Sequence, residues 1–359
     1  MIIQPHFFYL ANLFFSSLIL LFISIIIIAV FLRIRRDGKH AKWKLMADLL
    51  IRKAIFFEED EEFEKEKGIP VTSRTVKLLK NPHYRKLLTR ELLNAKKNVS
   101  GGSAENLVRL YLQLNLQYYA LINLKNGEWH IKAQAIQELS ILGLKEYLTK
   151  IYRYTNNAND LLRMEAQVAI LRLSGFEGLR FLDMVSYPLS EWQQIKLLHE
   201  LSHVSLENFR GIEKWLKSEN KSVVIFGLKL TRLYHRFELH DSVCACLVDE
   251  EPRVRLQAIY SLGKIYNEQT SEILISRILK EDIQHRMAII QVLQNICTNE
   301  DIPVLLDQLG TENQALKQVV AHALAKISPE GFAALLDHEH ANDYPLTEII
   351  AQLKSELAL

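Results

Sequence analysis

Hydrophobic residues recur at helical spacing along most of this chain, and the clearest example lies within residues 249–265. A helix is predicted to begin at Pro252, because three acidic residues precede it and a proline in the first turn loses no hydrogen bond there. The apolar positions that share one face of this helix are Val254, Ala258, Ile259 and Leu262. Gly263 near its end is typical of a close helix crossing. The stretch therefore predicts a helix that buries one side.

The same pattern returns at a nearly constant interval. The residues equivalent to Ala258 form a series that we call the repeat anchors, namely Ala135, Ala166, Leu197, Gly227, Ala258, Ile289 and Val320. A second series has the same spacing and comprises Ile151, Leu182, Ile212, Val243, Leu274, Leu305 and Leu336. In both series the intervals are 31, 31, 30, 31, 31 and 31 residues. Two registers that agree through seven copies predict an all-α solenoid of about seven helical pairs over residues 129–340.

The repeated block resembles the short bacterial HEAT repeat, also described as the phycobilisome-lyase-type HEAT-like repeat. The copies that carry the resemblance best are Ile131-Lys132 with Ala135, Leu162-Arg163 with Ala166, and Val254-Arg255 with Ala258. The resemblance implies a stack of helix pairs that offers an extended surface to another protein. It does not carry over the chromophore-attachment activity of lyases with such repeats, because those enzymes are soluble.

One position after the first apolar residue of each copy is basic in five of seven copies. We call it the lead position, and its residues are Lys132, Arg163, Gln194, Val224, Arg255, Arg286 and Lys317. The resemblance implies that each basic residue pairs with an acidic residue of the neighbouring repeat, which would form an internal ladder. A ligand-binding stripe is the alternative. Because the ladder is interrupted at Gln194 and Val224, and because Gly227 weakens its helix, residues 190–235 are expected to form a soft joint.

The N-terminal part of the chain predicts a membrane anchor. Residues 7–32 carry no charge and are long enough to cross a hydrocarbon core of about 30 Å. A cleaved signal peptide is the alternative, but no basic residue precedes the run. Basic residues follow it instead, from Arg33 to Lys44, which favours a cytoplasmic C-terminal side and leaves residues 1–6 outside.

The rest of the chain is divided by composition. Residues 33–70 are expected to form a basic juxtamembrane segment and an acidic spacer, with a short amphipathic helix at 43–57 on the membrane surface. Residues 71–128 are expected to hold cap helices and a candidate degenerate repeat, and residues 341–359 a C-terminal cap helix.

Composition changes this picture little. The chain has 359 residues, of which 49% are hydrophobic, and only 13 glycines and 8 prolines, as expected for an all-helical protein. A net charge of +2 gives no general case for binding nucleic acid. Its three cysteines indicate no disulfide framework and are expected to be buried in a reduced compartment.

One motif has the form of a zinc-peptidase site. His199, Glu200 and His203 match the H-E-x-x-H pattern, in which two histidines on one helix face bind zinc and the glutamate activates water. The hydrophobic stripe of this repeat, formed by residues such as Leu197 and Leu201, predicts that both histidines lie on the opposite side of the helix, facing solvent. This placement argues against a zinc site, so a membrane-tethered zinc metallopeptidase is kept only as the alternative function.

The remaining histidines are expected at the surface, including His240, His338 and His340. No phosphate-binding loop, nucleophile elbow or carboxylate pair is present in the sequence. The sequence therefore predicts a single-pass protein of the inner membrane with a cytoplasmic HEAT-like scaffold. It would contact lipid through residues 7–32 and bind another protein that is membrane-associated or cytoplasmic. It would bind no nucleic acid, need no cofactor or metal, and have no catalytic residues of its own.

Overall fold

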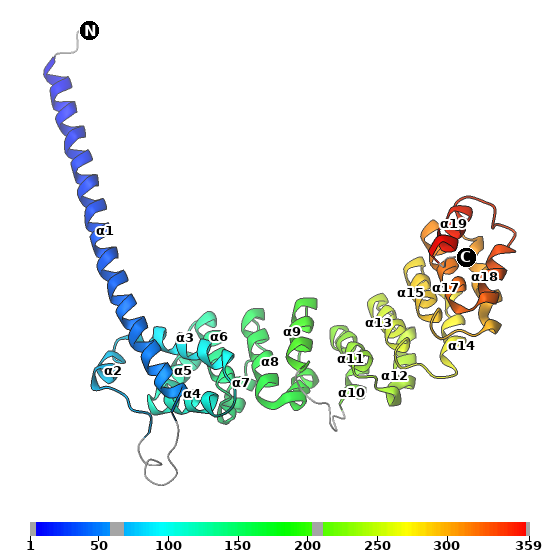
Figure 1. Ribbon diagram of the computed structural model, residues 1–359, viewed down its shortest axis with the longest axis horizontal. Coiled ribbons are helices and arrows are strands. Elements are labelled where there is room, and N and C mark those ends of the chain that lie inside the picture. Colours follow the sequence, from blue (N-terminus) through cyan, green and yellow to red (C-terminus); the bar gives the residue numbers. More distant parts are fainter. Residues whose placement is uncertain (1–4, 58–67, 203–210, 357–359) are drawn as a thin grey trace. The chain divides into compact units, whose positions relative to one another are not determined.

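The computed structural model describes residues 5–57, 68–202 and 211–356. These residues form α-helices and short 3-10 helices with no β-strand among them, so the predicted all-α, HEAT-like solenoid class is confirmed. The chain divides into two compact units, residues 1–148 and residues 149–359. Figure 1 shows the helices in the order of the chain.

The first unit is built around the C-terminal half of one long helix. Its helices are α1 (Pro5–Ile55), α2 (Ser73–Leu78), α3 (Pro82–Asn98), α4 (Gly101–Gln113), α5 (Leu116–Asn126) and α6 (Trp129–Ile141). Helix α1 packs against α3 and α4, which also contact each other. Helix α4 contacts α5, and α6 packs against α5 and α3.

Helix α1 differs from the prediction. A membrane helix followed by a separate surface helix at 43–57 was expected, whereas α1 runs without a break to Ile55. Its last turns are buried against protein through Ala47, Leu50, Ile51 and Ala54. The expected surface helix was wrong because an amphipathic pattern does not tell whether the apolar face meets lipid or a neighbouring helix.

The second unit is a series of helix pairs, beginning with α7 (Leu148–Tyr152), which spans the boundary between the units. The first helices of the pairs are α8 (Asp160–Ser174), α9 (Glu191–Leu201), α11 (Lys221–Leu233), α13 (Pro252–Leu262), α15 (Ile283–Leu293) and α17 (Gln314–Ile327). The second helices are shorter and comprise α10 (Ile212–Leu216), α12 (His240–Ala245), α14 (Thr270–Ile275), α16 (Ile302–Asp307) and α18 (Pro329–Leu336). Helix α19 (Leu346–Glu356) packs on α17 at the end of the series.

Short 3-10 helices complete the second layer and the turns of the array. They are η1 (Lys145–Tyr147), η2 (Gly175–Asp183), η3 (Phe237–Leu239), η4 (Cys246–Val248), η5 (Ile278–Lys280), η6 (Asn299–Asp301) and η7 (Gln308–Gly310). The segment η2 packs on α8 in the place of a regular second helix.

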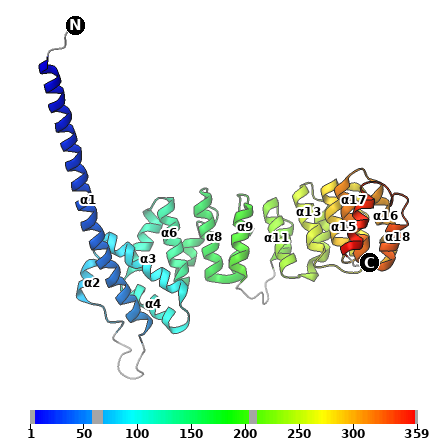
Figure 2. The same ribbon diagram turned by 45° about the horizontal axis from the view of Figure 1, so that its top comes forward.

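The first helices stand side by side as one row (Figures 1 and 2). Helix α8 contacts α9, α11 contacts α13, α13 contacts α15, and α15 contacts α17. Helix α18 packs on α17 of its own pair, whereas α10, α12, α14 and α16 pack on the first helix of the following pair, namely α11, α13, α15 and α17. One hydrophobic core runs through the pairs from Val168 to Leu353. Every repeat is therefore stabilised by its neighbours, as in other helical arrays.

One repeat anchor, Ala135, lies on α6, and the other six lie at equivalent places on the first helices of the second unit; all seven are buried. Gly227 on α11 faces the second helix of the preceding pair. A Cβ atom at this position would lie 3.3 Å from Cδ2 of Leu216 and 3.5 Å from Cβ of Trp215. At Gly263, which follows α13, a Cβ atom would lie 3.0 and 3.1 Å from the two γ-methyl groups of Val292. Both glycines thus permit close crossings, and the crossing at Gly263 is the tighter one.

A polar pair is enclosed in the first unit. The hydroxyl of Tyr111 on α4 donates a hydrogen bond of 2.6 Å to the carboxylate of Glu138 on α6. Burial raises the pKa of Glu138 to about 7, against the opposing effect of this hydrogen bond. The ordinary pKa of a glutamate side chain is 4.5. At pH values between 4.5 and about 7, the folded protein therefore keeps a proton on Glu138 that the unfolded chain has lost.

The two glycines lead to a first prediction. We expect Gly227→Ala to stabilise the protein by up to about 1 kcal/mol, because alanine favours the helix and only the flexible end of Leu216 must move. Gly263→Ala should destabilise it by about 1–3 kcal/mol, because buried Val292 has little room to shift. Thermal unfolding and hydrogen exchange of the amides of α10 and α11 measure both effects. A larger loss of stability for Gly227→Ala than for Gly263→Ala would contradict this reading. The soft joint expected at residues 190–235 stays a prediction, and the same hydrogen-exchange measurement tests it.

The Tyr111–Glu138 pair leads to a second prediction. As the pH rises from about 4.5 to about 7, folding stability should fall, because the folded state must lose the proton that it holds more tightly. Glu138→Gln keeps an acceptor for Tyr111 and carries no charge, so it should remove this dependence and raise stability at pH 8 by on the order of 2 kcal/mol. Protection factors of α4 and α6 amides in the full chain at the two pH values test this. Tyr111→Phe is the matched control and should steepen the dependence, and an unchanged dependence in Glu138→Gln would refute the assignment.

Candidate functional site

The lead-position side chains bind backbone carbonyl groups at the junctions between repeats. On α8, a guanidinium nitrogen of Arg163 donates to the carbonyl oxygens of Asn157 and Ala158 at 2.6 and 3.2 Å. On α13, Arg255 repeats this contact with the carbonyl oxygens of Asp249 and Glu250 at 3.0 and 3.3 Å. In each case the accepting carbonyls lie five and six residues before the arginine, in the loop that leads into its helix.

The next repeat shows a related contact. On α15, Nε of Arg286 donates to the carbonyl oxygen of Glu281 at 2.8 Å. Lys132 on α6 and Lys317 on α17 occupy the equivalent position and are half-buried. The three arginines thus satisfy carbonyl groups that the turns leave without an amide partner, a requirement for buried backbone.

An acidic partner of the kind expected for a ladder accompanies Arg255. Its Nε lies 3.1 Å from a carboxylate oxygen of Glu281, whose side chain is 3% exposed. Arg277 contacts the other oxygen of this carboxylate at 2.5 Å. Arg163 differs from the expectation, because its guanidinium instead lies over the ring of Tyr187, 4.5 Å from the ring centre. The hydrogen bonds to carbonyl groups, rather than ion pairs, are the common feature of these arginines.

The two positions where the ladder was expected to break behave differently from each other. The side chain of Gln194 on α9 is buried and donates to the carbonyl oxygen of Leu189 at 3.2 Å, so glutamine makes the same kind of contact as the arginines. Its own oxygen accepts a hydrogen bond of 2.8 Å from Lys229 on α11. Val224 is buried in the core and has no polar group to offer. The interruption in chemistry therefore concerns α11 alone.

The residues directly before the first helices form a further series with the repeat interval, which the apolar pattern alone did not predict. The residues immediately before the first helices are Asn159, Ser190, Asn220, Glu251, Asp282 and Asn313, at intervals of 31, 30, 31, 31 and 31. All of them except Glu251 cap their helix, as Asn159 illustrates: its side-chain oxygen accepts a hydrogen bond of 3.0 Å from the amide of Leu162. Ser190 forms a capping box with Gln193. The spacing of these cap-forming residues could have located the start of each first helix.

The zinc-peptidase motif is only partly described. His199 is exposed on α9, on the side away from the core, as expected. The carboxylate of Glu200 accepts a hydrogen bond of 2.5 Å from Arg172 on α8. In a zinc peptidase this carboxylate would activate water, whereas here it binds an arginine. His203 lies outside the described residues. Among the described residues, no group of three or more metal-binding side chains is found.

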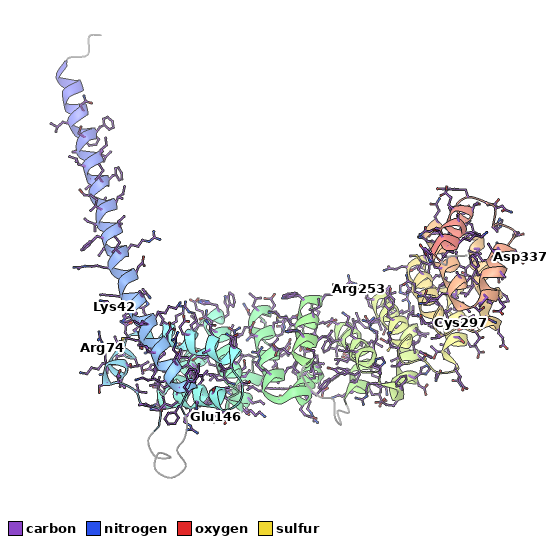
Figure 3. The ribbon with its side chains drawn as sticks, in the orientation of Figure 1. Lys42, Arg74, Glu146, Arg253, Cys297 and Asp337 are labelled. Atoms are coloured by element: carbon purple, nitrogen blue, oxygen red, sulfur yellow. The ribbon has the colours of Figure 1, made fainter. Side chains whose placement is uncertain are left out.

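His240 corrects an expectation. It was expected at the surface but is buried, and its Nε2 lies 2.8 Å from the hydroxyl of Thr270 in the next repeat. The histidine thus links two second helices. Burial raises the pKa of Cys244 and Cys246 to about 11 and that of Cys297 (Figure 3) to about 12, so all three thiols are protonated at neutral pH. Protonated thiols are poor nucleophiles and poor metal ligands.

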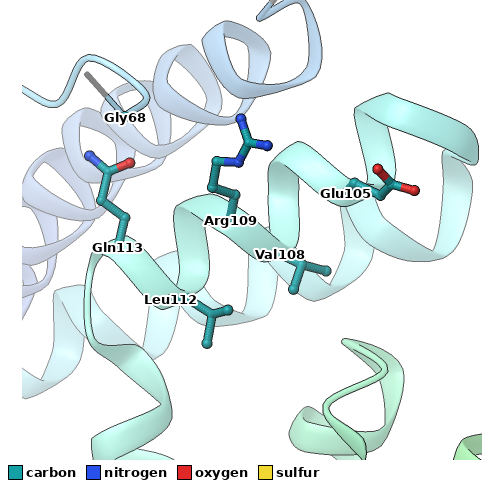
Figure 4. A pocket seen from close by; sticks show the side chains of 6 residues that line it. All are labelled: Gly68, Glu105, Val108, Arg109, Leu112 and Gln113. Atoms are coloured by element: carbon teal, nitrogen blue, oxygen red, sulfur yellow. The ribbon is translucent and has the colours of Figure 1, made fainter. Parts of the chain in front are cut away.

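A shallow open groove in the first unit lies along α4 (Figure 4). It is lined by Gly68, Glu105, Val108, Arg109, Leu112 and Gln113. Gln113 donates a hydrogen bond of 2.8 Å to the carbonyl oxygen of Ile69, which fixes the loop beside the groove. One carboxylate, one guanidinium and one amide along an open groove do not make a nucleophile–base arrangement, so the groove does not indicate catalysis.

The contacts of Arg255 lead to a third prediction. Arg255→Ala removes two carbonyl partners and one of two cations beside a buried carboxylate, so we expect the unfolding free energy to fall by about 2 kcal/mol. Arg253→Ala is a matched control on the same helix, because Arg253 is exposed and should change stability by less than about 0.5 kcal/mol. Chemical denaturation of the two variants measures the difference. Equal effects would show that the Arg255 contacts contribute nothing to the junction.

Comparison with known proteins agrees with the helical-repeat fold. The model of the family described as HEAT repeats matches residues 241–325. No curated protein sequence matches the chain.

Three solved structures are similar to it. An engineered protein is 15% identical, with 79% of this chain and 87% of that chain covered and a TM-score of 0.41. Human deoxyhypusine hydroxylase in complex with glycerol is 16% identical over 89% of this chain and 96% of that chain, with a TM-score of 0.28. The complex of CpcE and CpcF of phycocyanin lyase from Nostoc sp. PCC7120 is 13% identical over 82% of this chain and 100% of that chain, with a TM-score of 0.27. Because all three TM-scores lie below 0.5, these likenesses carry no conclusion about activity. The HEAT-repeat match over residues 241–325 and the paired helices agree with an all-helical repeat fold.

Proposed function

We propose that this protein is a membrane-anchored scaffold, in which one apolar helix enters the inner membrane and the helical repeats bind another protein in the cytoplasm. The observation that carries the proposal is the two-part character of α1. From Leu13 to Ile34 its large apolar side chains are exposed, whereas from Ala47 to Ile55 it contributes to the core of the first unit. One helix therefore has a surface suited to lipid and a surface fixed to protein.

The apolar part of α1 supports the anchor by its length and composition. The segment Asn12–Ile55 contains a window with a mean hydropathy of 3.0 and none of that window is buried. Exposing such a surface to water is unfavourable, and a bilayer would cover it. A signal sequence near an N-terminus has a similar composition, so the experiment below includes that outcome.

The charges after the apolar run support the orientation. Arg33 forms an exposed ion pair with Asp37, and Arg35 lies over the ring of Phe31. Basic residues next to a membrane helix favour the cytoplasmic side. The proposed division is accordingly an outer segment at 1–6, a membrane segment at 7–32 and a cytoplasmic remainder.

The repeats support a binding role rather than catalysis. Extended helical arrays offer many small contacts to a partner, and the side chains that could do chemistry here are engaged or protonated. Glu200 is held by Arg172, and the thiols have raised pKa values. The polar contacts at the repeat junctions stabilise the array, so we assign the repeat anchors and the lead-position residues to structure and not to a ligand site.

The anchor proposal leads to a fourth prediction. The full chain should sediment with membranes and resist alkaline extraction, whereas a variant lacking residues 1–40 should be soluble and still helical, because Ala47, Leu50, Ile51 and Ala54 remain to complete the first unit. Circular dichroism and membrane fractionation measure this. In the full-length control Leu20→Lys/Ile27→Lys, each charge should weaken insertion by about 2.5–3.5 kcal/mol. If mass spectrometry of the mature protein showed that the apolar run is missing, the run would be a cleaved signal peptide and not an anchor.

A further inference from the structure

Charge is strongly segregated within the second unit. The first helices α11, α13, α15 and α17 contain no aspartate or glutamate. They contain eight basic residues, which are Lys221, Lys229, Arg232, Arg253, Arg255, Arg286, Lys317 and Lys326. The earlier first helices α8 and α9 carry both signs of charge, so the segregation belongs to the last four pairs.

The segments that follow these four helices have the opposite character. Residues 234–251, 263–282, 294–313 and 328–344 hold the short second helices and the turns. Together they carry 17 acidic residues and four basic ones. The first helices α11, α13, α15 and α17 are therefore positive, whereas the second helices and turns that follow them are mostly acidic, although the whole chain has a net charge of only +2.

Some of the eight basic residues serve the junctions, and the others face outward. Lys221 pairs with Asp249 at 2.6 Å, and Arg255 is held by the contacts described above. At 100° per residue, Lys229, Arg232, Arg253 and Lys326 fall on the side of their helices that is turned away from the core. Arg253 and Lys326 are exposed, and Figure 3 shows Arg253 projecting away from the helices.

These four outward residues lack carboxylate partners among the described residues. Lys229 donates instead to the amide oxygen of Gln194, and Lys326 donates to the amide oxygen of Asn295 at 3.0 Å. Neither Arg232 nor Arg253 forms an ion pair with a described residue. Burial lowers the pKa of Lys229, and Arg232 lowers it further against the opposing effect of Glu191. None of these four cations is therefore held in an ion pair within the part of the chain that the structure describes.

Apolar side chains share this outward side with the basic ones. Ile225, Leu256 and Met287 occupy the same position on α11, α13 and α15, two residues before the repeat anchors. Each is only partly buried against the core. Tyr260 lies one turn further along α13 and is half-buried. The surface therefore offers a row of apolar contacts bordered by cations that have no carboxylate partner among the described residues, and we call it the first-helix face of α11–α17.

We propose that the first-helix face of α11–α17 binds an acidic segment of a partner protein in which carboxylates alternate with apolar side chains. This inference rests on the proposed scaffold function and names the chemistry of the partner. Carboxylates would meet Lys229, Arg232, Arg253 and Lys326, and apolar side chains would cover Ile225, Leu256 and Met287. The partner would carry the charge that these helices lack, which favours encounter and alignment.

The arrangement favours a peptide over a nucleic acid. A duplex presents phosphates at short regular spacing and is bound by dense clusters of lysine and arginine. Here four outward cations are spread over three helices, and the row between them is apolar. An aliphatic row contributes little to phosphate contacts, whereas it suits the apolar side of an amphipathic peptide.

The test uses the full chain in detergent micelles and a fluorescein-labelled peptide of about 16 residues in which Glu and Leu recur three and four apart. A peptide with every Glu replaced by Gln is the neutral control. We expect saturable binding of the acidic peptide that weakens as salt is raised above about 0.15 M. The double variant Arg253→Glu/Lys326→Glu should weaken binding at least about tenfold, measured by fluorescence anisotropy.

The matched control reverses two exposed cations elsewhere, Lys280→Glu/Lys354→Glu, and should bind like the unmodified protein. Leu256→Ser should weaken binding of the acidic peptide without altering its salt dependence. Absence of saturable binding, or equal effects of the two double variants, would overturn the inference. Tighter binding of a labelled DNA duplex than of the peptide would overturn it in favour of nucleic acid. A partner captured by crosslinking equally well by the Arg253→Glu/Lys326→Glu variant would leave the scaffold function standing and refute this face alone.

Discussion

The junction between one helix pair and the next is the constraint on which the array depends. The chain must turn sharply there, and the turn leaves carbonyl groups that no helix amide can reach. Arg163 and Arg255, and Gln194 with a shorter side chain, reach back from the first turn of the next helix to bind these carbonyls. At the start of α8 and α9, the side chains of Asn159 and Ser190 accept hydrogen bonds from amides on the other side of the turn. At these two junctions both ends of the turn are thus satisfied by side chains from one short stretch.

This constraint explains what the sequence could and could not predict. The 31-residue interval was visible because burial repeats at each anchor, so the paired helices and their order followed from it. The residues before each first helix follow the same interval, so the sequence also contained the information needed to predict where these helices begin. The partners of the lead-position arginines were not visible, because a carbonyl acceptor has no side-chain identity to recognise. The burial of His240 could not be predicted for a related reason, because its partner Thr270 comes from the next repeat.

Net charge was a poor guide to the surface. A value of +2 indicates a nearly neutral protein, yet the last four first helices hold only positive charges and the segments after them hold mostly negative ones. The sum cancels because the two sets alternate along the chain, first helix by first helix. Charge statistics taken over a whole repeat protein therefore hide what a count over equivalent helices reveals. The same averaging concealed the polar Tyr111–Glu138 pair within a mostly apolar unit.

In the proposed anchor, the unbroken course of α1 would set the distance between the first unit and the membrane. Between Arg33, where the apolar run ends, and Ala47, where burial in the first unit begins, the chain remains helical. At about 1.5 Å per residue this stretch works as a spacer of roughly 20 Å. A flexible linker would let the first unit wander and turn freely, whereas a helix fixes both its height above the lipid and its rotation about the helix axis. The proposed anchor would then act as a mechanical mount, which holds the first unit at one height and in one orientation.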